Sequence, residues 1–94
     1  MERRILDENE LGEALRTLNG WQADDNKLKR RWKFDDFAAA LRFVNAVGDL
    51  AEAADHHPDI EFGWGYAAIE LTTHDRGGIT DVDLALASKI DSLS

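Results

Sequence analysis

Cysteine is absent from this 94-residue sequence and proline occurs once. Disulfide bonds and thiolate metal sites are therefore excluded. We expect one domain over residues 1–94, because a chain this short has no room for two cores. A domain of this size buries only about 60–65% of its unfolded surface, so we expect subunit association to add stability.

Long apolar runs and an excess of basic charge are also missing. No segment approaches the roughly 20 apolar residues of a membrane helix. The start MERRILDENE lacks the apolar core of a signal peptide. A formal net charge of -8 disfavours direct contact with a phosphate backbone. We therefore expect a cytoplasmic protein that binds neither nucleic acid directly nor a membrane.

The first predicted element is a short helix. Asp7 and Glu10 have the spacing of a reciprocal N-cap, and leucines follow at helical intervals. The helix is expected to run until Asn19-Gly20, which offers a left-handed stop.

Two strands are predicted next, over residues 21–23 and 28–34, around the polar turn 24–26. Alternation in the second strand places three basic side chains on the solvent face, namely Lys29, Arg31 and Lys33. Such a row protects a sheet edge or, alternatively, steers anions.

The longest helix is predicted to begin after Asp35 as its cap. Its apolar residues form one stripe with a second group nearby: Phe37, Leu41, Val44, Gly48 and Ala51, then Phe43, Val47 and Leu50. The apolar arc covers roughly 200° of the helix, more than one buried face requires. We expect one side to contact the sheet and another a second subunit, unless the alanines simply tolerate water.

The second half of the chain predicts a hairpin and a last helix. Residues 60–62 and 66–72 alternate as strands on either side of Gly63-Trp64-Gly65. Thr80 and Asp83 form a capping box. The helix that follows is expected to use four apolar residues, Val82, Leu86, Ile90 and Leu93. The order helix, two strands, helix, two strands, helix predicts the α+β class, with helices on one face of an antiparallel sheet.

All three histidines lie between positions 56 and 74. His56 and His57 precede Pro58, which disfavours helical geometry and places the pair on a fixed connection. The predicted hairpin then returns the chain so that His74 lies beside them. Imidazoles accept and donate protons near neutral pH, so such a cluster suits the elimination of water without a cofactor.

Three acids are candidates to orient these histidines: Glu52, Asp55 and Asp83. Each also has a simpler explanation. Asp83 is accounted for by helix capping and Glu52 by a solvated helix position. A lone His56 would be an ordinary turn residue, and Thr73 an ordinary strand residue.

A metal ion is the rival use of three histidines. Adjacent histidines on an extended backbone point apart, so both rarely bind one ion. We expect no metal. Nucleophilic hydrolysis, nucleotide use and zinc peptidase chemistry lack their sequence motifs.

One set of residues forms a distinctive pattern: Glu52-Ala53-Ala54-Asp55-His56-His57-Pro58, Thr73-His74, Gly78-Ile79-Thr80-x-x-Asp83 and Leu86-Ala87, with Gly20-Trp21 and Phe34-x-x-Phe37 before it. This pattern resembles the pterin-4a-carbinolamine dehydratase family, also known as the dimerisation cofactor of a homeodomain transcription factor. The resemblance covers nearly all of residues 52–91. A doubled histidine before proline, with Thr-His at this spacing, is the specific part.

The resemblance implies a four-stranded antiparallel sheet with three helices, and homodimers or homotetramers. It implies a hydro-lyase that converts 4a-hydroxytetrahydrobiopterin to quinonoid dihydropterin and water, recycling the pterin for an aromatic amino-acid hydroxylase. The implied catalytic residues are His56, His57, His74, Asp55, Glu52 and Asp83. The implied pterin-binding segments are His56-His57-Pro58 and Thr73-His74-Asp75-Arg76.

Three positions depart from the family pattern. Ala53 replaces a common lysine, Ile60 a common aromatic residue, and Trp64 the usual hairpin tyrosine. We expect Ile60 and Trp64 to alter the shape of the pocket. The alternative function is a non-catalytic dimerisation or assembly scaffold, which has no need of clustered histidines.

Overall fold

The computed structural model describes residues 4–18 and 20–93. Within them the element order is α1 (Glu8–Leu15), β1 (Gln22–Asp24), β2 (Lys27–Lys33), α2 (Phe37–Ala54), β3 (Asp59–Gly63), β4 (Tyr66–Leu71) and α3 (Asp81–Asp91). The strands form one antiparallel sheet in the order β1-β2-β4-β3. The predicted α+β class and element order are confirmed.

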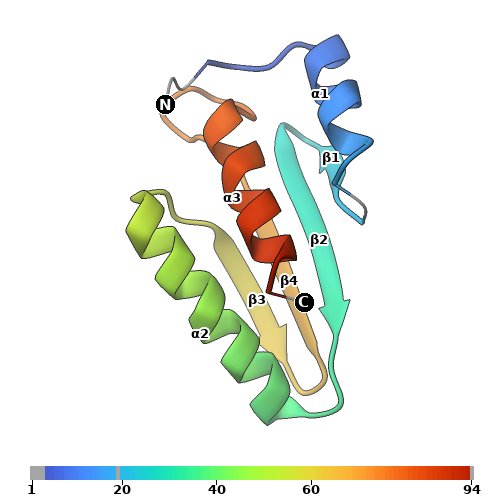
Figure 1. The fold of residues 1–94 in the computed structure, drawn as a ribbon, viewed down its shortest axis with the longest axis vertical. Coiled ribbons are helices and arrows are strands. Elements are labelled where there is room, and N and C mark those ends of the chain that lie inside the picture. Colours follow the sequence, from blue (N-terminus) through green and yellow to red (C-terminus); the bar gives the residue numbers. More distant parts are fainter. Residues whose placement is uncertain (1–3, 19, 94) are drawn as a thin grey trace.

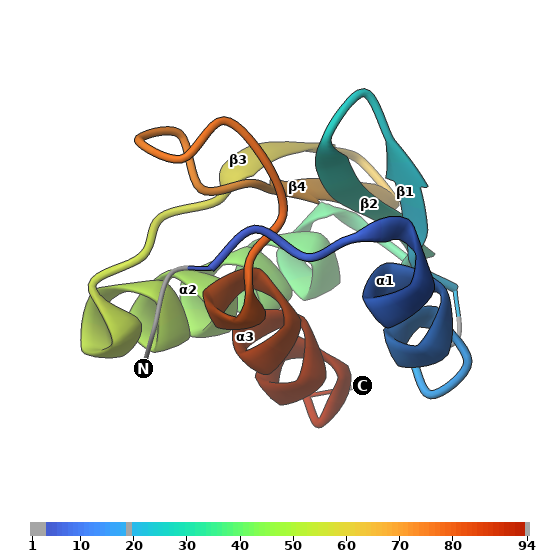
Figure 2. The same ribbon diagram turned by 90° about the horizontal axis from the view of Figure 1, so that it is seen from above.

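The helices lie on one face of the sheet and leave the other face open (Figure 1, Figure 2). Alternation on β4 follows this division, since Ala67, Ile69 and Leu71 are buried and the residues between them are half-buried. The core lies between the helices and this face of the sheet. In the described part of the chain, no helix is long and apolar enough to cross a membrane.

Helix α1 begins as predicted but ends early. The Asp7 side chain accepts a hydrogen bond from Glu10 N at 2.8 Å, and the Glu10 carboxylate accepts one from Asp7 N at 3.1 Å. The helix ends at Leu15, because the chain turns there and Leu18 packs in the core with 6% exposure. The predicted end at Asn19-Gly20 was therefore wrong; Asn19 lies outside the described residues.

The first hairpin matches its prediction to within one residue at each end. Asp25 and Asn26 both have left-handed φ values, 52° and 61°, which fit a two-residue hairpin turn. Leu28 and Trp32 on β2 are buried. The predicted basic row, Lys29, Arg31 and Lys33, lies on the opposite, open face. Two of its members are exposed and Lys29 is half-buried.

Helix α2 differs from its prediction in its cap. Its cap is Asp36, whose side chain accepts a hydrogen bond from Ala39 N at 2.8 Å, and not Asp35. The residues buried against the rest of the chain are Ala40, Phe43, Val47 and Ala51. The prediction did not say which side of the apolar arc contacts the sheet, and the buried side contains Phe43, Val47 and Ala51. Phe37 and Leu41 are 45% and 39% exposed.

Helix α3 has the predicted capping box, with Thr80 as its N-cap and Asp83 as the reciprocal partner. Leu86 and Ile90 are buried, as expected. Leu93 was wrongly placed on the apolar face, because the helix ends at Asp91 and Leu93 is 41% exposed.

Candidate active site

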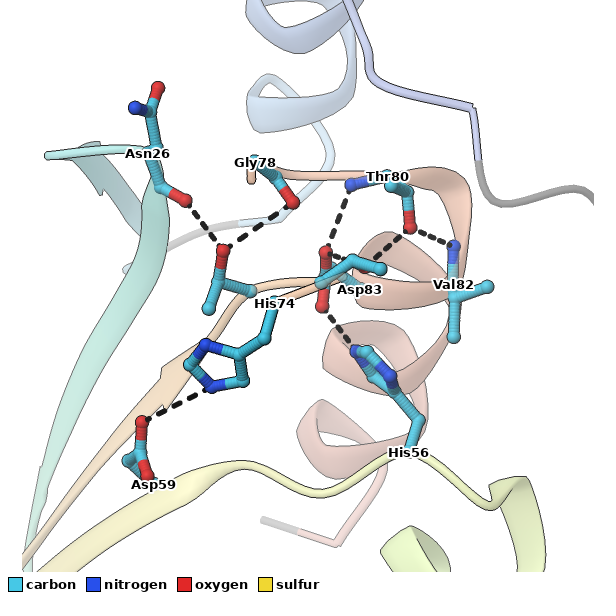
Figure 3. A network of polar contacts seen from close by, with 10 residues as sticks. Asn26, His56, Asp59, His74, Gly78, Thr80, Val82 and Asp83 are labelled. Atoms are coloured by element: carbon cyan, nitrogen blue, oxygen red, sulfur yellow. Dashed lines mark hydrogen bonds and ion pairs between the residues drawn. The ribbon is translucent and has the colours of Figure 1, made fainter. Parts of the chain in front are cut away.

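The β3–β4 hairpin brings the two histidine segments to one end of the molecule. Antiparallel pairing sets Asp59, the first residue of β3, opposite Glu70 near the end of β4. Residues 56–58 enter this end of the hairpin and residues 72–74 leave it. Figure 3 shows the His56 and His74 side chains there, beside the start of α3.

His56 forms a buried pair with Asp83. Its Nε2 lies 2.5 Å from Asp83 Oδ1, and the two side chains are 7% and 0% exposed. The position of His56 follows from the end of α2, where Asp55 turns left-handed at φ 48° and His56 N donates to Ala51 O at 3.1 Å. The chain thus turns from α2 directly toward the first turn of α3.

The Asp83 carboxylate serves the helix cap and the histidine at the same time. Its Oδ2 accepts hydrogen bonds from Thr80 N and from the Thr73 hydroxyl, each at 2.9 Å. The hydroxyls of Thr73 and Thr80 lie 2.8 Å apart. Capping and histidine support were alternatives in the sequence, and the structure combines them (Figure 3).

His57 forms an exposed pair with Glu52. Nε2 of His57 is in short contact with Glu52 Oε2, and the side chains are 57% and 77% exposed. Glu52 lies in the last turn of α2, five residues before His57. Glu52 is thus solvated and also oriented toward a histidine.

His74 is exposed and has a weaker partner. Its Nε2 lies 3.9 Å from Asp59 Oδ2, with the side chains 71% and 66% exposed. The turn that holds it closes with hydrogen bonds from Thr73 N to Gly78 O and from Gly77 N to Thr73 O, both 2.9 Å. Sequence reasoning missed Asp59. The available signal was that Asp59 begins one strand of the predicted hairpin, while His74 follows the other strand.

The other expected site residues lie in the same two segments as the histidines. Asp55 caps α2, and its side chain makes no hydrogen bond or ion pair within the described residues. Pro58 is half-buried, while Asp75 and Arg76 are exposed in the turn after His74. Among residues 4–18 and 20–93, no three His, Asp or Glu side chains are grouped closely enough to hold a metal ion.

Of the two departures expected to alter the pocket, Trp64 lies at the far end of the hairpin from the histidines, whereas Ile60 follows Asp59 at the same end. Trp64 is 74% exposed in the β3–β4 turn, at the opposite end of the hairpin. Ile60 packs against the core and pairs with Ile69.

The site therefore combines one buried and one exposed imidazole, each with a carboxylate on Nε2, and a third imidazole at the same end of the hairpin. A carboxylate on one ring nitrogen fixes the orientation of the ring and leaves the other nitrogen for a reacting group. Such an arrangement is suited to moving two protons in one reaction.

Comparison with known proteins identifies the family of the chain. A family model described as pterin 4 alpha carbinolamine dehydratase matches residues 4–93. A relative from Metallosphaera sedula, provisionally named pterin-4-alpha-carbinolamine dehydratase, is 42% identical, with 94% of this chain and 92% of the relative covered. A relative from a Picosynechococcus strain, with the same provisional name, is 46% identical, with 94% and 96% covered.

Solved structures give the same result. A transcriptional coactivator/pterin dehydratase from Brucella melitensis superposes with a TM-score of 0.91 at 36% identity, covering 96% of this chain and 98% of that one. A pterin dehydratase-like protein, identified as a RuBisCO assembly factor in the alpha-carboxysome, has a TM-score of 0.63 at 30% identity, with 78% and 84% covered. The chain belongs to the pterin-4-alpha-carbinolamine dehydratase family.

Proposed function

We propose that this chain is a hydro-lyase that dehydrates 4a-hydroxytetrahydrobiopterin to quinonoid dihydropterin and water. In this reaction the C4a–O bond breaks, a proton from the protein converts the departing hydroxide to water, and the N5 proton is removed as a double bond forms between C4a and N5. The observation that carries the proposal is the pair of sequence neighbours, His56 and His57, each held by its own carboxylate.

The proposal assigns the two proton transfers to the histidines at this end of the hairpin. A reaction that needs both a proton donor and a proton acceptor is served by imidazoles in different surroundings. His56 is buried on Asp83, whereas His57 and His74 are exposed. General acid–base catalysis of this kind typically contributes about 10²–10⁴-fold. The reaction requires neither a metal nor a cofactor in this scheme.

The proposed pterin site lies between the two segments that carry the histidines. Residues 56–58 precede β3, and residues 73–76 follow β4. His74, Asp75 and Arg76 are exposed there, so this turn is accessible to a flat heterocycle. We assign recycling of the pterin for an aromatic amino-acid hydroxylase as the role of the reaction.

The experiment that tests this function follows dehydration of chemically generated 4a-hydroxytetrahydrobiopterin by stopped-flow absorbance. We expect the purified chain to accelerate the reaction equally with and without a chelator. His57→Ala should lower the rate by about tenfold or more. The matched control is Asp49→Ala, an exposed residue one turn before Glu52 on α2. An unaltered rate in His57→Ala contradicts the proposed role of His57.

A second candidate function is that of an assembly scaffold, and the exposed side of α2 favours it. Phe37 and Leu41 are large, apolar and more than a third exposed, and a structural neighbour is a RuBisCO assembly factor. We propose that this side joins copies into a homodimer or homotetramer. Analytical ultracentrifugation of the wild type and of Leu41→Glu tests the interface. Assembly without any dehydration would favour the scaffold.

A further inference from the structure

The Asp83 carboxylate has different partners on its two oxygens. Oδ2 accepts from Thr80 N and from the Thr73 hydroxyl, both at 2.9 Å, while Oδ1 lies 2.5 Å from His56 Nε2. An ionised carboxylate only accepts hydrogen bonds. Two donors on Oδ2 stabilise the charged form in a residue with no solvent exposure.

The direction of the hydroxyl hydrogen bonds is fixed by counting donors. Thr80 Oγ1 already accepts from Val82 N at 3.3 Å and lies 2.8 Å from Thr73 Oγ1. Each hydroxyl has one proton to donate. Every group has a partner when Thr80 donates to Thr73 and Thr73 donates to Asp83. Figure 3 shows Asp83 between its partners Thr80 and His56.

We infer that the Thr73 hydroxyl is a positioning group that sets the tautomer of His56. With Asp83 charged, the proton between the two side chains belongs to Nε2 of His56. The neutral ring then presents an unprotonated Nδ1, which forms no hydrogen bond within the described residues. The inference deepens the proposed function, on which its catalytic consequence rests, by making Nδ1 of His56 the proton acceptor.

Thr73 acts through Asp83 and not through the substrate. Its side chain is 1% exposed, so the hydroxyl is inaccessible to a bound pterin. Without that hydroxyl, Oδ2 retains only the Thr80 N–H. The carboxylate is then held less firmly against Nε2, so the preference for Nε2–H weakens and the single proton of the neutral His56 ring can exchange through solvent to Nδ1. This reversed tautomer is a donor where the reaction needs an acceptor.

The chain offers a matched control one residue away. The Thr72 hydroxyl is also buried and donates to Asn26 O at 2.8 Å, but no contact joins it to Asp83. Thr73→Val and Thr72→Val therefore remove the same group, in the same strand extension, with only the first affecting Asp83. Thr73→Ser keeps the hydroxyl and tests for rescue.

The primary experiment determines histidine tautomers by long-range ¹H–¹⁵N NMR, well above the ordinary imidazole pKa of about 6.5. Only three histidines contribute signals, and His56→Asn identifies its own. We expect the Nε2–H tautomer at His56 in the wild type, in Thr73→Ser and in Thr72→Val. Thr73→Val should show a substantial Nδ1–H population. An Nδ1–H tautomer in the wild type overturns the inference even if no variant folds.

Activity gives a second, separable result. If the chain is a dehydratase, Thr73→Val should lower kcat by about tenfold, as expected for about 1.4 kcal/mol, with KM within about twofold. Thr73→Ser should restore kcat. If the chain has no activity but shows the expected tautomers, the proposed function is contradicted, whereas the inference about the tautomer of His56 is still supported. If the chain is active but the His56 tautomer is the same in Thr73→Val and in the wild type, the inference is contradicted and the proposed function stands.

Discussion

The two adjacent histidines each contact a carboxylate, but one pair is buried and the other is exposed to solvent. His56 and Asp83 are enclosed, and Asp83 is held by two further donors. His57 and Glu52 are both more than half exposed. Electrostatic interactions are stronger in the buried pair, because little water screens them. The comparison separates the two rings: the surroundings of His56 fix the orientation of its ring, whereas those of His57 leave its ring open to solvent.

The largest effect should come from breaking the buried pair. Asp83→Asn keeps the shape of the side chain but removes the charge, so His56 loses its charged acceptor and the α3 cap is weakened. We expect dehydration to fall by about 100-fold or more and the free energy of unfolding to fall by about 2–4 kcal/mol. Stopped-flow rates and urea denaturation measure the two effects.

The control for this variant is Asp81→Asn, which removes a neighbouring charge from the same first turn of α3. Asp81 makes no hydrogen bond to His56. Equal losses of activity in the two variants would contradict a specific role for Asp83.

A smaller effect is expected from the exposed pair. Glu52→Gln removes the charge beside His57, and we expect the rate to fall by about tenfold or less. The free energy of unfolding should change by less than about 0.5 kcal/mol, because exposed ion pairs contribute little. Asp49→Asn on the same helix serves as the control. A stability loss as large as that of Asp83→Asn would remove the contrast between the pairs.

The smallest expected effect is on stability, and it comes from an exposed ion pair away from the histidines, Arg4 and Glu10. Arg4 donates to both Glu10 oxygens, at 2.7 and 2.5 Å, and these hydrogen bonds lower the pKa of Glu10 to about 2. Because the folded-state pKa is lowered, the pair stabilises the fold above the ordinary value of 4.5. This contribution is lost as the pH falls toward 2.

The test is the pH dependence of urea denaturation for the wild type and Glu10→Gln. The wild type should lose stability slightly more steeply than the variant between pH 4.5 and 2. Parallel curves would show that this exposed pair contributes nothing measurable.

Local signals in the sequence predicted the elements well. The capping boxes at Asp7 and Thr80 and the turn at Asp25-Asn26 depend on neighbouring residues, and the structure has all of them. The end of α1 and the choice of Asp36 over Asp35 were not predictable in this way. Both depend on how Leu18 and the start of α2 pack against the rest of the fold.

The site was predicted in part, because some of its residues also carry signals that depend only on their neighbours in the sequence. Helical spacing and the capping box identified Glu52 and Asp83 as candidates, but not which histidine each contacts. Asp59 was missed, and Thr73 was expected only in the pterin-binding segment and not as a partner of Asp83, because these contacts depend on the register of β3 against β4 and on the turn at residues 74–77. The apolar arc of α2 was evident, whereas the side that faces the sheet was not.

The most direct test compares the wild type with the His56→Asn/His57→Asn double variant in the dehydration of 4a-hydroxytetrahydrobiopterin under identical conditions. Our account predicts saturable acceleration by the wild type and a rate close to the uncatalysed one for a folded double variant. Equal rates for the two proteins would contradict it.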